Sequence, residues 1–379
     1  MTPPLPRFAA GVSKGKHNMT HPLKFIRWLF ALGLFLLSTS AARADAPKVI
    51  RMAFPGVGVG NRPVTGGSSV STAHLQGLLE NEFKKDGIQV TWSFLRGAGP
   101  AVNELYANGL ADFSLLGDLP SIIGHSGGLK TRVLAATAIR GNTYIFVPTG
   151  SSIQTVSDLR GKKVAIFKGT NIQLTANKIL EKFGLKESDI RAINMDSSTA
   201  KAAMATGDID AAFGWTEYLS LRDQGLARLL YSTDQSDPLS YRHCSFIGSE
   251  EFIRKYPEIT QRVVKTVVLA AKWLSDQDAN PAQAFQLWTR SGVTFANYKE
   301  DQGTRSLKVL SSPLLDDYLI SQYNTNIQEA KRFGLIRNTF KFEDWYEPTF
   351  LQQVLKELKL EEYWVPYGAD GKPKSVPKT

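Results

Sequence analysis

The sequence predicts an α/β protein built as two doubly wound lobes. Short apolar runs alternate with amphipathic segments, this alternation occurs twice, and glycine-containing turns follow the apolar runs. Strands that alternate with helices in this way favour a mostly parallel sheet with helices on both faces. The chain has 379 residues, 42% of them hydrophobic, which is enough for one large or two medium domains.

The elements of the first half can be assigned in order. Residues 49–54, 88–95 and 111–117 are predicted to be strands, while residues 71–87 and 101–109 are predicted to be helices. After residue 240 helices dominate. The last of them is amphipathic, with its apolar side formed by Phe350, Leu351, Val354, Leu355 and Leu358.

An internal repeat supports two lobes of similar design. Residues 105–121 align with residues 204–220, so that Asp112 matches Asp210 at the start of an apolar strand. We expect lobe 1 to begin at residue 45 and end at 142, lobe 2 to span 143–242, and residues 243–379 to complete lobe 1. The hinges between the lobes are predicted in the strands 143–148 and 243–248.

Residues 1–44 are typical of a secretory signal peptide. Two basic residues precede a ten-residue apolar run at 28–37, and Ala42-Arg43-Ala44 fits an A-x-A cleavage site. The run is shorter than the roughly 20 residues that span a bilayer. We therefore expect cleavage after Ala44 and export to a bacterial periplasm. A signal peptide of ordinary length would begin at Met19, which is a candidate for the true start.

Charge and residue types exclude several functional classes. Of the 45 lysines and arginines, six lie in residues 1–44, which leaves 39 against 35 acidic residues and a net charge of +4 rather than +10. No basic run remains that would indicate a nucleic-acid partner. The scattered histidines and the single Cys244 match no metal-ligand spacing, and no nucleophile motif is present. We therefore expect no metal, no cofactor and no catalytic residue.

Glycine and small hydroxyl or amide residues recur where a strand ends and a helix begins. They do so in five loops, at residues 66–69, 96–100, 117–121, 168–171 and 214–218. In an open α/β sheet such loops meet at the carboxyl ends of the strands, where ligands bind. Helix N-termini there favour an anion. Plain N-capping explains any one of these loops, but five loops from both halves favour a shared anion site.

Four stretches of the chain resemble one family of exported proteins. They are LLGDLPS, DLRGKKVAIFKGTN, GDIDAAFGWTEYL and SEEFIRKYPEITQRVVKTV, and the similarity covers roughly residues 48–360. They resemble the periplasmic substrate-binding proteins of ABC importers for aliphatic sulfonates, taurine and nitrate, and the aliphatic-sulfonate branch above all. The resemblance implies a bilobed, periplasmic-binding-protein-like fold of type II, in which hinge strands join two lobes that close over a ligand.

The resemblance also assigns site residues. It implies that Gly117 and Asp118 line the site from lobe 1 and face Gly169, Thr170 and Asn171 of lobe 2. The family often has Lys-Gly-Ser-Ser where this chain has residues 168–171, and a Trp-Asp-Pro where it has Trp-Thr-Glu. These departures leave the ligand open among alkyl sulfonates, taurine, an aromatic sulfonate, nitrate or a larger molecule.

Six further candidates come from the loops and the expected hinge: Ser68, Ser69, Gly99, Trp215, Glu217 and Arg242. Trp215 is either a wall of the site or a packed core residue. Arg242 is either the partner of an oxyanion or a solvated surface residue. Asp118 and Glu217 would repel an anion, so these carboxylates either point away from the site or bind an amino group of the ligand.

The function expected from these features is the capture of a small anionic solute by a monomer that delivers it to the membrane subunits of an ABC permease. Two other classes stay open. An enzyme can use the same bilobed fold, and a ligand-sensing protein would need a separate signalling partner. No nucleophile, metal cluster or acid–base pair supports the enzyme.

Overall fold

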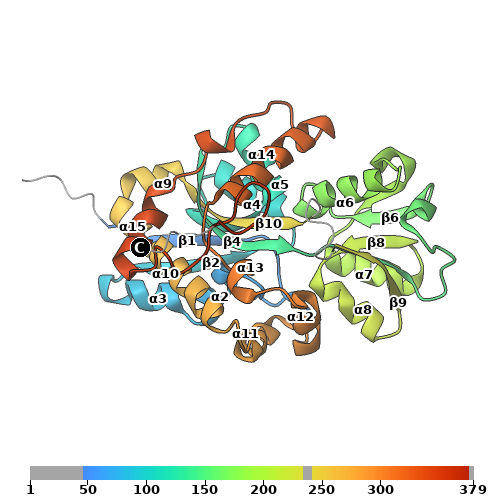
Figure 1. Ribbon diagram of the computed structural model, residues 1–379, viewed down its shortest axis with the longest axis horizontal. Coiled ribbons are helices and arrows are strands. Elements are labelled where there is room, and N and C mark those ends of the chain that lie inside the picture. The colour runs from blue at the N-terminus through green and yellow to red at the C-terminus, as the bar shows by residue number, and fades with distance from the viewer. Residues whose placement is uncertain (1–45, 234–240, 375–379) are drawn as a thin grey trace, which may run out of the picture. The chain divides into compact units, whose positions relative to one another are not determined.

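The computed structural model describes residues 46–233 and 241–374, which form two five-stranded sheets with helices on both faces of each (Figure 1). The predicted signal peptide lies outside the described residues. In the part of the chain that is described, no helix is both long and apolar enough to cross a membrane.

The first sheet has the strand order β2-β1-β3-β10-β4. Strand β1 pairs in parallel with β2 and with β3, whereas β10 runs antiparallel between β3 and β4. The strands are β1 (Val49–Phe54), β2 (Gln89–Phe94), β3 (Phe113–Gly117), β4 (Thr131–Gly141) and β10 (Arg242–Ser249). We call this sheet and the helices packed on it lobe 1.

Helices cover both faces of the first sheet because each face of β1 and β3 is apolar. One apolar cluster packs under the helices α2 (Ser69–Leu75), α3 (Leu78–Phe83), α9 (Glu250–Lys255), α10 (Pro257–Asp276) and α15 (Thr349–Leu358). The other packs under α4 (Ala98–Ala107), α5 (Asp118–Ser126) and α14 (Asp317–Arg332). Beyond α10 lie three short helices: α11 (Ala282–Trp288), α12 (Phe295–Gln302) and α13 (Leu307–Leu310).

The second sheet has the order β7-β6-β8-β5-β9 and forms lobe 2. Its strands are β5 (Tyr144–Pro148), β6 (Lys163–Ile166), β7 (Arg191–Asn194), β8 (Ala211–Gly214) and β9 (Ala227–Ser232). In Figure 1, α6 (Asn171–Lys182) lies on one side of this sheet, and α7 (Ser197–Thr206) and α8 (Leu219–Asp223) lie on the other. This separation follows from β5, where Ile145 and Val147 face one apolar cluster and Tyr144 and Phe146 face the other.

The predicted internal repeat is confirmed by a pair of matching contacts. In lobe 1 the Asp112 carboxylate accepts the Arg51 backbone N–H at 2.8 Å, and in lobe 2 the Asp210 carboxylate accepts the Lys163 backbone N–H at 2.7 Å. Each aspartate thus fixes the start of the central strand to the strand beside it. The strand order β2-β1-β3 in lobe 1 corresponds to the order β7-β6-β8 in lobe 2.

The predicted elements are found with two differences. The helix expected over residues 71–87 is broken into α2 and α3 at Gly77, whose φ of +64° lies in the left-handed region. The two segments expected as hinges each belong to one sheet, so the chain crosses between lobes just before them.

The outward crossing runs through Asn142 and Thr143, between β4 and β5. On the return, the described chain reaches Thr233 after β9 and resumes at Tyr241, just before β10. Thr143 and Thr233 hold the two crossings together, because the Thr143 N–H donates to Thr233 Oγ1 at 2.7 Å and the Thr233 N–H donates to the Thr143 carbonyl at 2.9 Å. Arg242, which we expected at the end of lobe 2, is the first residue of β10 in lobe 1.

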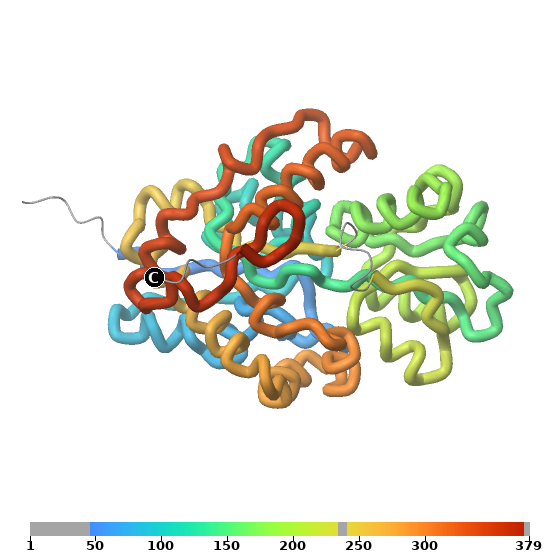
Figure 2. The backbone as a smooth tube through the Cα atoms, viewed as in Figure 1, coloured from blue at the N-terminus to red at the C-terminus, as the bar shows by residue number. Residues whose placement is uncertain are grey.

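Figure 2 follows the chain through this arrangement. The backbone leaves lobe 1 after β4, builds the whole of lobe 2, returns at β10 and then continues in the helices of lobe 1. Residues from both early and late parts of the sequence can therefore line one site at the junction.

Candidate functional site

A cavity of about 280 Å³ lies between the lobes, at the ends of β1 and β3 where helices begin. Its wall comes mainly from lobe 1, and lobe 2 contributes Thr170, Asn171 and residues 215–217. This is the edge of the sheets where an open α/β fold binds ligands.

Eight of the eleven predicted site residues line this cavity: Ser68, Gly99, Gly117, Thr170, Asn171, Trp215, Glu217 and Arg242. Three of the helices that begin there are α4, α5 and α6. No side chain caps the N-termini of α4 and α5, whose N-cap residues are Gly97 and Gly117. In these first turns the Ala98 N–H donates to the Leu95 carbonyl and the Leu119 N–H to the Asp118 carboxylate, while Pro100 and Pro120 have no N–H. The N–H groups of Gly99 and Asp118 are the donors left for an anion.

The loop before α6 faces the loop before α5. Asn171 Nδ2 lies 2.9 Å from the position that a Cβ on Gly117 would occupy, and it lies 3.9 Å from Cys244 Sγ in β10. A Cβ on Gly169 would stand 2.9 Å from Pro100 Cγ in α4. The two lobes are therefore in close contact at this edge of the cavity, and only glycine fits at both positions.

Three predicted site residues do not line the cavity: Ser69, Asp118 and Gly169. The Ser69 hydroxyl is buried and donates to the Thr137 carbonyl at 3.4 Å. Gly169 shapes the turn before α6 with a φ of +73°, and its N–H donates to Gln173 Oε1 at 2.8 Å.

Asp118 points away from the cavity into lobe 1. Its carboxylate accepts three hydrogen bonds, from the N–H groups of Leu119 and His243 and from Asn326 Nδ2, at 2.7 to 3.1 Å. Burial raises the pKa of Asp118 to about 6, against the lowering effect of these N–H groups and of the nearby cations Lys178 and Arg242. The carboxylate is thus a structural acceptor between α5, β10 and α14.

Arg242 and Trp215 lie together on the cavity wall. The Arg242 guanidinium lies 5.9 Å from the centre of the Trp215 ring, and it donates through Nε and Nη2 to the Asn142 carbonyl. No carboxylate of a described residue forms an ion pair with it. Glu217 also lines the cavity, but its carboxylate lies 3.8 Å from Lys201 Nζ. Arg242 therefore brings to the wall a positive charge that no carboxylate of a described residue offsets.

The wall holds two other arginines, Arg140 and Arg305. The Arg140 guanidinium lies between two tyrosine rings, 4.2 Å from the centre of Tyr318 and 4.5 Å from that of Tyr367. Arg305 donates to three backbone carbonyls, those of Arg140, Asp301 and Gln302. Both arginines bring positive charge near the cavity. The Arg305 donors serve the fold, whereas Arg140 Nε and Nη2 are buried without a hydrogen-bond partner.

Sequence reasoning missed the part of the wall that comes from α10 to α13: Leu274, Phe285, Trp288, Ser291, Val293, Tyr298, Asp301, Gln302, Arg305, Leu307, Leu310 and Ser311. Aromatic and aliphatic residues at helical spacing usually indicate a core, and most of these residues are also buried. No feature of the sequence distinguishes a core contact from a cavity wall here.

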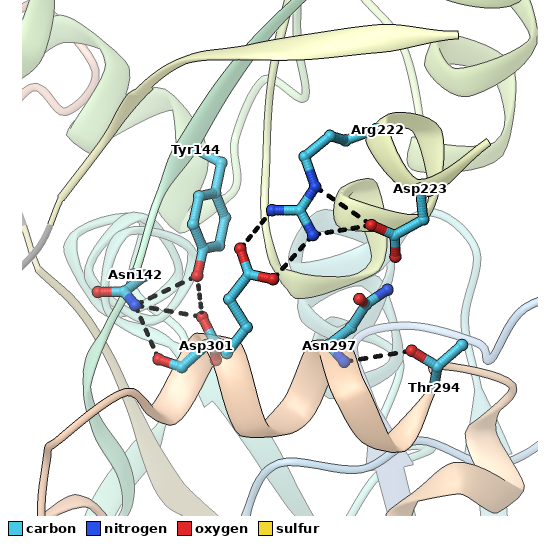
Figure 3. Close-up of polar contacts among 8 residues, drawn as sticks. Asn142, Tyr144, Arg222, Asp223, Thr294, Asn297 and Asp301 are labelled. Carbon is cyan, nitrogen blue, oxygen red and sulfur yellow. Dashed lines mark hydrogen bonds and ion pairs between the residues drawn. The ribbon is translucent and has the colours of Figure 1, made fainter. Parts of the chain in front are cut away.

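Helix α12 connects this wall to lobe 2 (Figure 3). Glu300 forms an ion pair with Arg222, which is also held by Asp223. Asp301, one position further along α12, accepts the Tyr144 hydroxyl at 2.6 Å. Asn142 Nδ2, at the outward crossing, donates to the Asp301 carbonyl at 2.9 Å. The helix that lines the cavity therefore also holds lobe 2 in its position.

Cys244 lies on the cavity wall in β10. Burial raises the pKa of its thiol to about 12. At neutral pH the thiolate needed for nucleophilic attack is scarcely populated. This agrees with the expectation of an inert cysteine.

Behind this wall, His243 makes stability depend on pH. Its ring is fully buried, Nε2 has no hydrogen-bond partner, and Nδ1 accepts the Arg140 N–H at 3.4 Å. Burial, with Lys178, Arg140 and Arg242 nearby, lowers the pKa of His243 to about 3. A lowered histidine pKa contributes stability that is present above the unfolded value of 6.5 and is lost as the pH falls toward 3.

We expect His243→Phe to remove this dependence. Between pH 7.5 and pH 5 the original protein should lose about 2 kcal/mol more than the variant, since each bound proton changes stability by about 1.4 kcal/mol per pH unit. That corresponds to roughly 4 °C in Tm, measured by circular dichroism. Asp118 acts in the opposite sense, because its contribution is lost as the pH rises through about 6, but it is present in both proteins. Equal losses in both would contradict the prediction.

The protein has two α/β lobes that are joined by crossings of the backbone, and a cavity lies between them. This arrangement defines the bilobed periplasmic-binding-protein fold. The comparisons agree with this class. The family model described as NMT1/THI5 like matches residues 81–284, which is more than half of the chain. The chain belongs to this family.

Relatives named for the binding of sulfonates or taurine align with much of the chain. A protein of Bacillus subtilis (strain 168), named for binding aliphatic sulfonates, is 27% identical over 294 residues, or 76% of this chain and 86% of that protein. A taurine-binding periplasmic protein of Escherichia coli (strain K12) is 23% identical over 222 residues, or 56% of this chain and 68% of that protein.

Solved structures agree on the fold. The sulfonate-binding protein SsuA of Methylobacillus flagellatus KT is 28% identical, with a TM-score of 0.71 over 85% of this chain and 98% of that one. The desulfurization enzyme DSZB, solved in complex with biphenyl-2-sulfinic acid, is 19% identical, with a TM-score of 0.61 over 82% of this chain and 99% of that one. The fold is therefore shared by binding proteins and by at least one enzyme.

Proposed function

We propose that the chain is the substrate-binding component of an ABC importer and captures a small organic sulfonate between its two lobes. The observation that carries the proposal is the cavity where the N-termini of α4 and α5 meet the loop before α6, with Arg242 on its wall. Relatives named for sulfonates and taurine support the same class of ligand.

Binding needs no covalent step at such a site. The sulfonate oxygens accept hydrogen bonds from the first-turn N–H groups and from the Arg242 guanidinium, both of which favour negative charge. Gly99 and Gly117 supply donors from lobe 1, and Asn171 supplies them from lobe 2, where the Thr170 hydroxyl already donates to the Phe167 carbonyl. Exclusion of water from the closed cavity strengthens each of these bonds.

Export and delivery complete the proposal. The signal peptide is removed after Ala44, the mature protein works in the periplasm as a monomer, and its closed form docks on the permease subunits. N-terminal sequencing of the secreted protein tests the cleavage site, and gel filtration tests the oligomeric state.

An enzyme is the second candidate, since the desulfurization enzyme has the same fold. One observation disfavours it: the thiol of Cys244 faces the cavity with a pKa raised to about 12, so it is a poor nucleophile. Incubation with a bound sulfonate or sulfinate should release neither sulfite nor sulfate. Release of either would favour the enzyme.

A thermal-shift screen tests the binding function directly. Sulfonates, taurine, nitrate, sulfate and carboxylates of matched shape are added to the mature chain, and Tm is measured. A ligand present at about 100 times its Kd stabilises the native state by about 2.7 kcal/mol, or roughly 5 °C. We expect this shift with at least one sulfonate and a much smaller one with its carboxylate analogue. Shifts with nitrate or sulfate alone, or no shift at all, would contradict the proposal.

A further inference from the structure

The part of the cavity wall formed by α10 to α13 carries six apolar or aromatic side chains beside the polar Ser291, Asp301, Gln302, Arg305 and Ser311. We call this part the side chamber. It is lined by Leu274, Phe285, Trp288, Tyr298, Leu307 and Leu310. The first five of these side chains are at most 7% exposed, so they are held in place by the packing of lobe 1.

The aromatic rings of the chamber use their polar atoms within the protein. Trp288 Nε1 donates to Thr72 Oγ1 at 3.0 Å, and the Tyr298 hydroxyl is hydrogen-bonded to Ser291 Oγ at 2.8 Å. The Trp288 ring packs at an angle of 43° on Phe285 and of 55° on Tyr298. The rings therefore offer carbon surface to an occupant and keep their hydrogen bonds for the fold.

The long glycine-rich loop at residues 55–67 closes the chamber. Its glycines allow this, because a Cβ on Gly58 would stand 2.5 Å from the Ser291 carbonyl oxygen, and a Cβ on Gly66 would collide with Tyr298 and Trp288. The Val59 N–H also donates to the Ser291 carbonyl at 2.8 Å. The loop thus lies directly against the chamber's helices.

The volume of the whole cavity is sufficient for a ligand that contains a ring. The cavity of about 280 Å³ is roughly twice the engineered apolar cavity of about 150 Å³ that binds benzene. A cavity of this size fits a sulfonate at the helix N-termini together with a ring in the side chamber.

The carboxylates of the wall argue against an amino group on the ligand. Asp301 already accepts the Tyr144 hydroxyl and Asn142 Nδ2, and Glu217 lies 3.8 Å from Lys201 Nζ. An ammonium in the cavity would have to compete with these partners. Taurine therefore fits the cavity less well than a sulfonate whose carbon part is entirely apolar.

From these observations we infer that the ligand is an aromatic sulfonate whose ring occupies the side chamber beneath residues 55–67. The inference rests on the proposed function, which supplies the sulfonate. It narrows the ligand class that the sequence left open, and it differs from the aliphatic sulfonates for which one relative is named.

Calorimetry with four sulfonates tests the inference. Naphthalene-2-sulfonate should bind on the order of 100-fold more tightly than ethanesulfonate, because the ring buries far more apolar surface. Taurine should bind no more tightly than ethanesulfonate, from which it differs by one amino group. Hexanesulfonate should bind more weakly than the naphthalene ligand. If naphthalene-2-sulfonate binds no more tightly than ethanesulfonate, taurine or hexanesulfonate, the inference is overturned but the proposed function stays intact. If no sulfonate binds, both the inference and the proposed function are overturned.

A variant that fills the side chamber tests whether the ring of the ligand binds there. Leu310→Phe should weaken naphthalene-2-sulfonate at least 10-fold and change ethanesulfonate by less than 2-fold, because only the ring reaches α13. Leu269→Phe makes the same change on an exposed part of α10 and should alter neither affinity. Ethanesulfonate binding and Tm show that each variant is folded. Equal losses for both ligands in Leu310→Phe would overturn the assignment of the ring to the chamber.

Discussion

Replacing Arg242 by glutamine is expected to weaken sulfonate binding on the order of 100-fold. The guanidinium lines the cavity, donates to the Asn142 carbonyl and has no carboxylate of a described residue in ion-pair contact. Glutamine keeps a donor for that carbonyl but removes the charge. Truncating one partner of a buried charge pair typically costs 2–5 kcal/mol. Isothermal titration calorimetry with the sulfonate that gives the largest thermal shift measures the change.

Arg228→Gln is the matched control. Arg228 also donates to backbone carbonyls, those of Ser151 and Ile153, but it lies away from the cavity. Its loss should change stability without changing affinity by more than about 2-fold. Arg242→Lys should retain part of the binding, since it restores the charge but not the planar pair of donors. An Arg242→Gln affinity within a factor of three of the original would remove this residue from the anion site.

The chain's local patterns were sufficient to predict the sheets and the facing loops. Alternating strands and helices gave β1, β2 and β3 within a few residues, and the repeat identified Asp112 and Asp210 as equivalent. The prediction that the loop at 168–171 faces that at 117–121 came from the resemblance to the binding-protein family, and the Asn171–Gly117 contact agrees with it. These features depend on turns and periodicity that lie within short stretches of sequence.

Other features depend on contacts between distant residues and could not be predicted. Asp118 follows a strand and precedes a helix, as a ligand residue would. Its direction is set by His243, which is 125 residues later, and by Asn326, which is 208 residues later. The side chamber is missed for a similar reason, because Trp288 and Tyr298 have the spacing of ordinary core residues. The packing of α11 and α12 on the loop at 55–67 decides which of the buried rings line the side chamber.

The second large effect on affinity is expected from substitution of Gly169, where the two lobes are in close contact. Gly169 has a φ of +73°, and a Cβ there would stand 2.9 Å from Pro100 Cγ in the opposite lobe. Gly169→Asp should therefore destabilise the closed form through backbone strain, steric overlap and a negative charge beside the anion. Apparent affinity falls in proportion to the closed population, so we expect a loss of 10- to 100-fold for aspartate and about 5-fold for Gly169→Ala.

Two further variants separate lobe closure from backbone strain. Gly161 lies in the same lobe with a φ of +74° and has no atom within 4 Å of its Cβ position, so Gly161→Ala adds the strain alone and should leave affinity unchanged. Pro100→Ala in the Gly169→Ala background removes the overlapping ring carbon and should restore most of the affinity. A double-mutant cycle in calorimetry measures this coupling. If Pro100→Ala gives no rescue, the loss comes from the α6 turn itself, and contact between the two lobes at this point does not control binding.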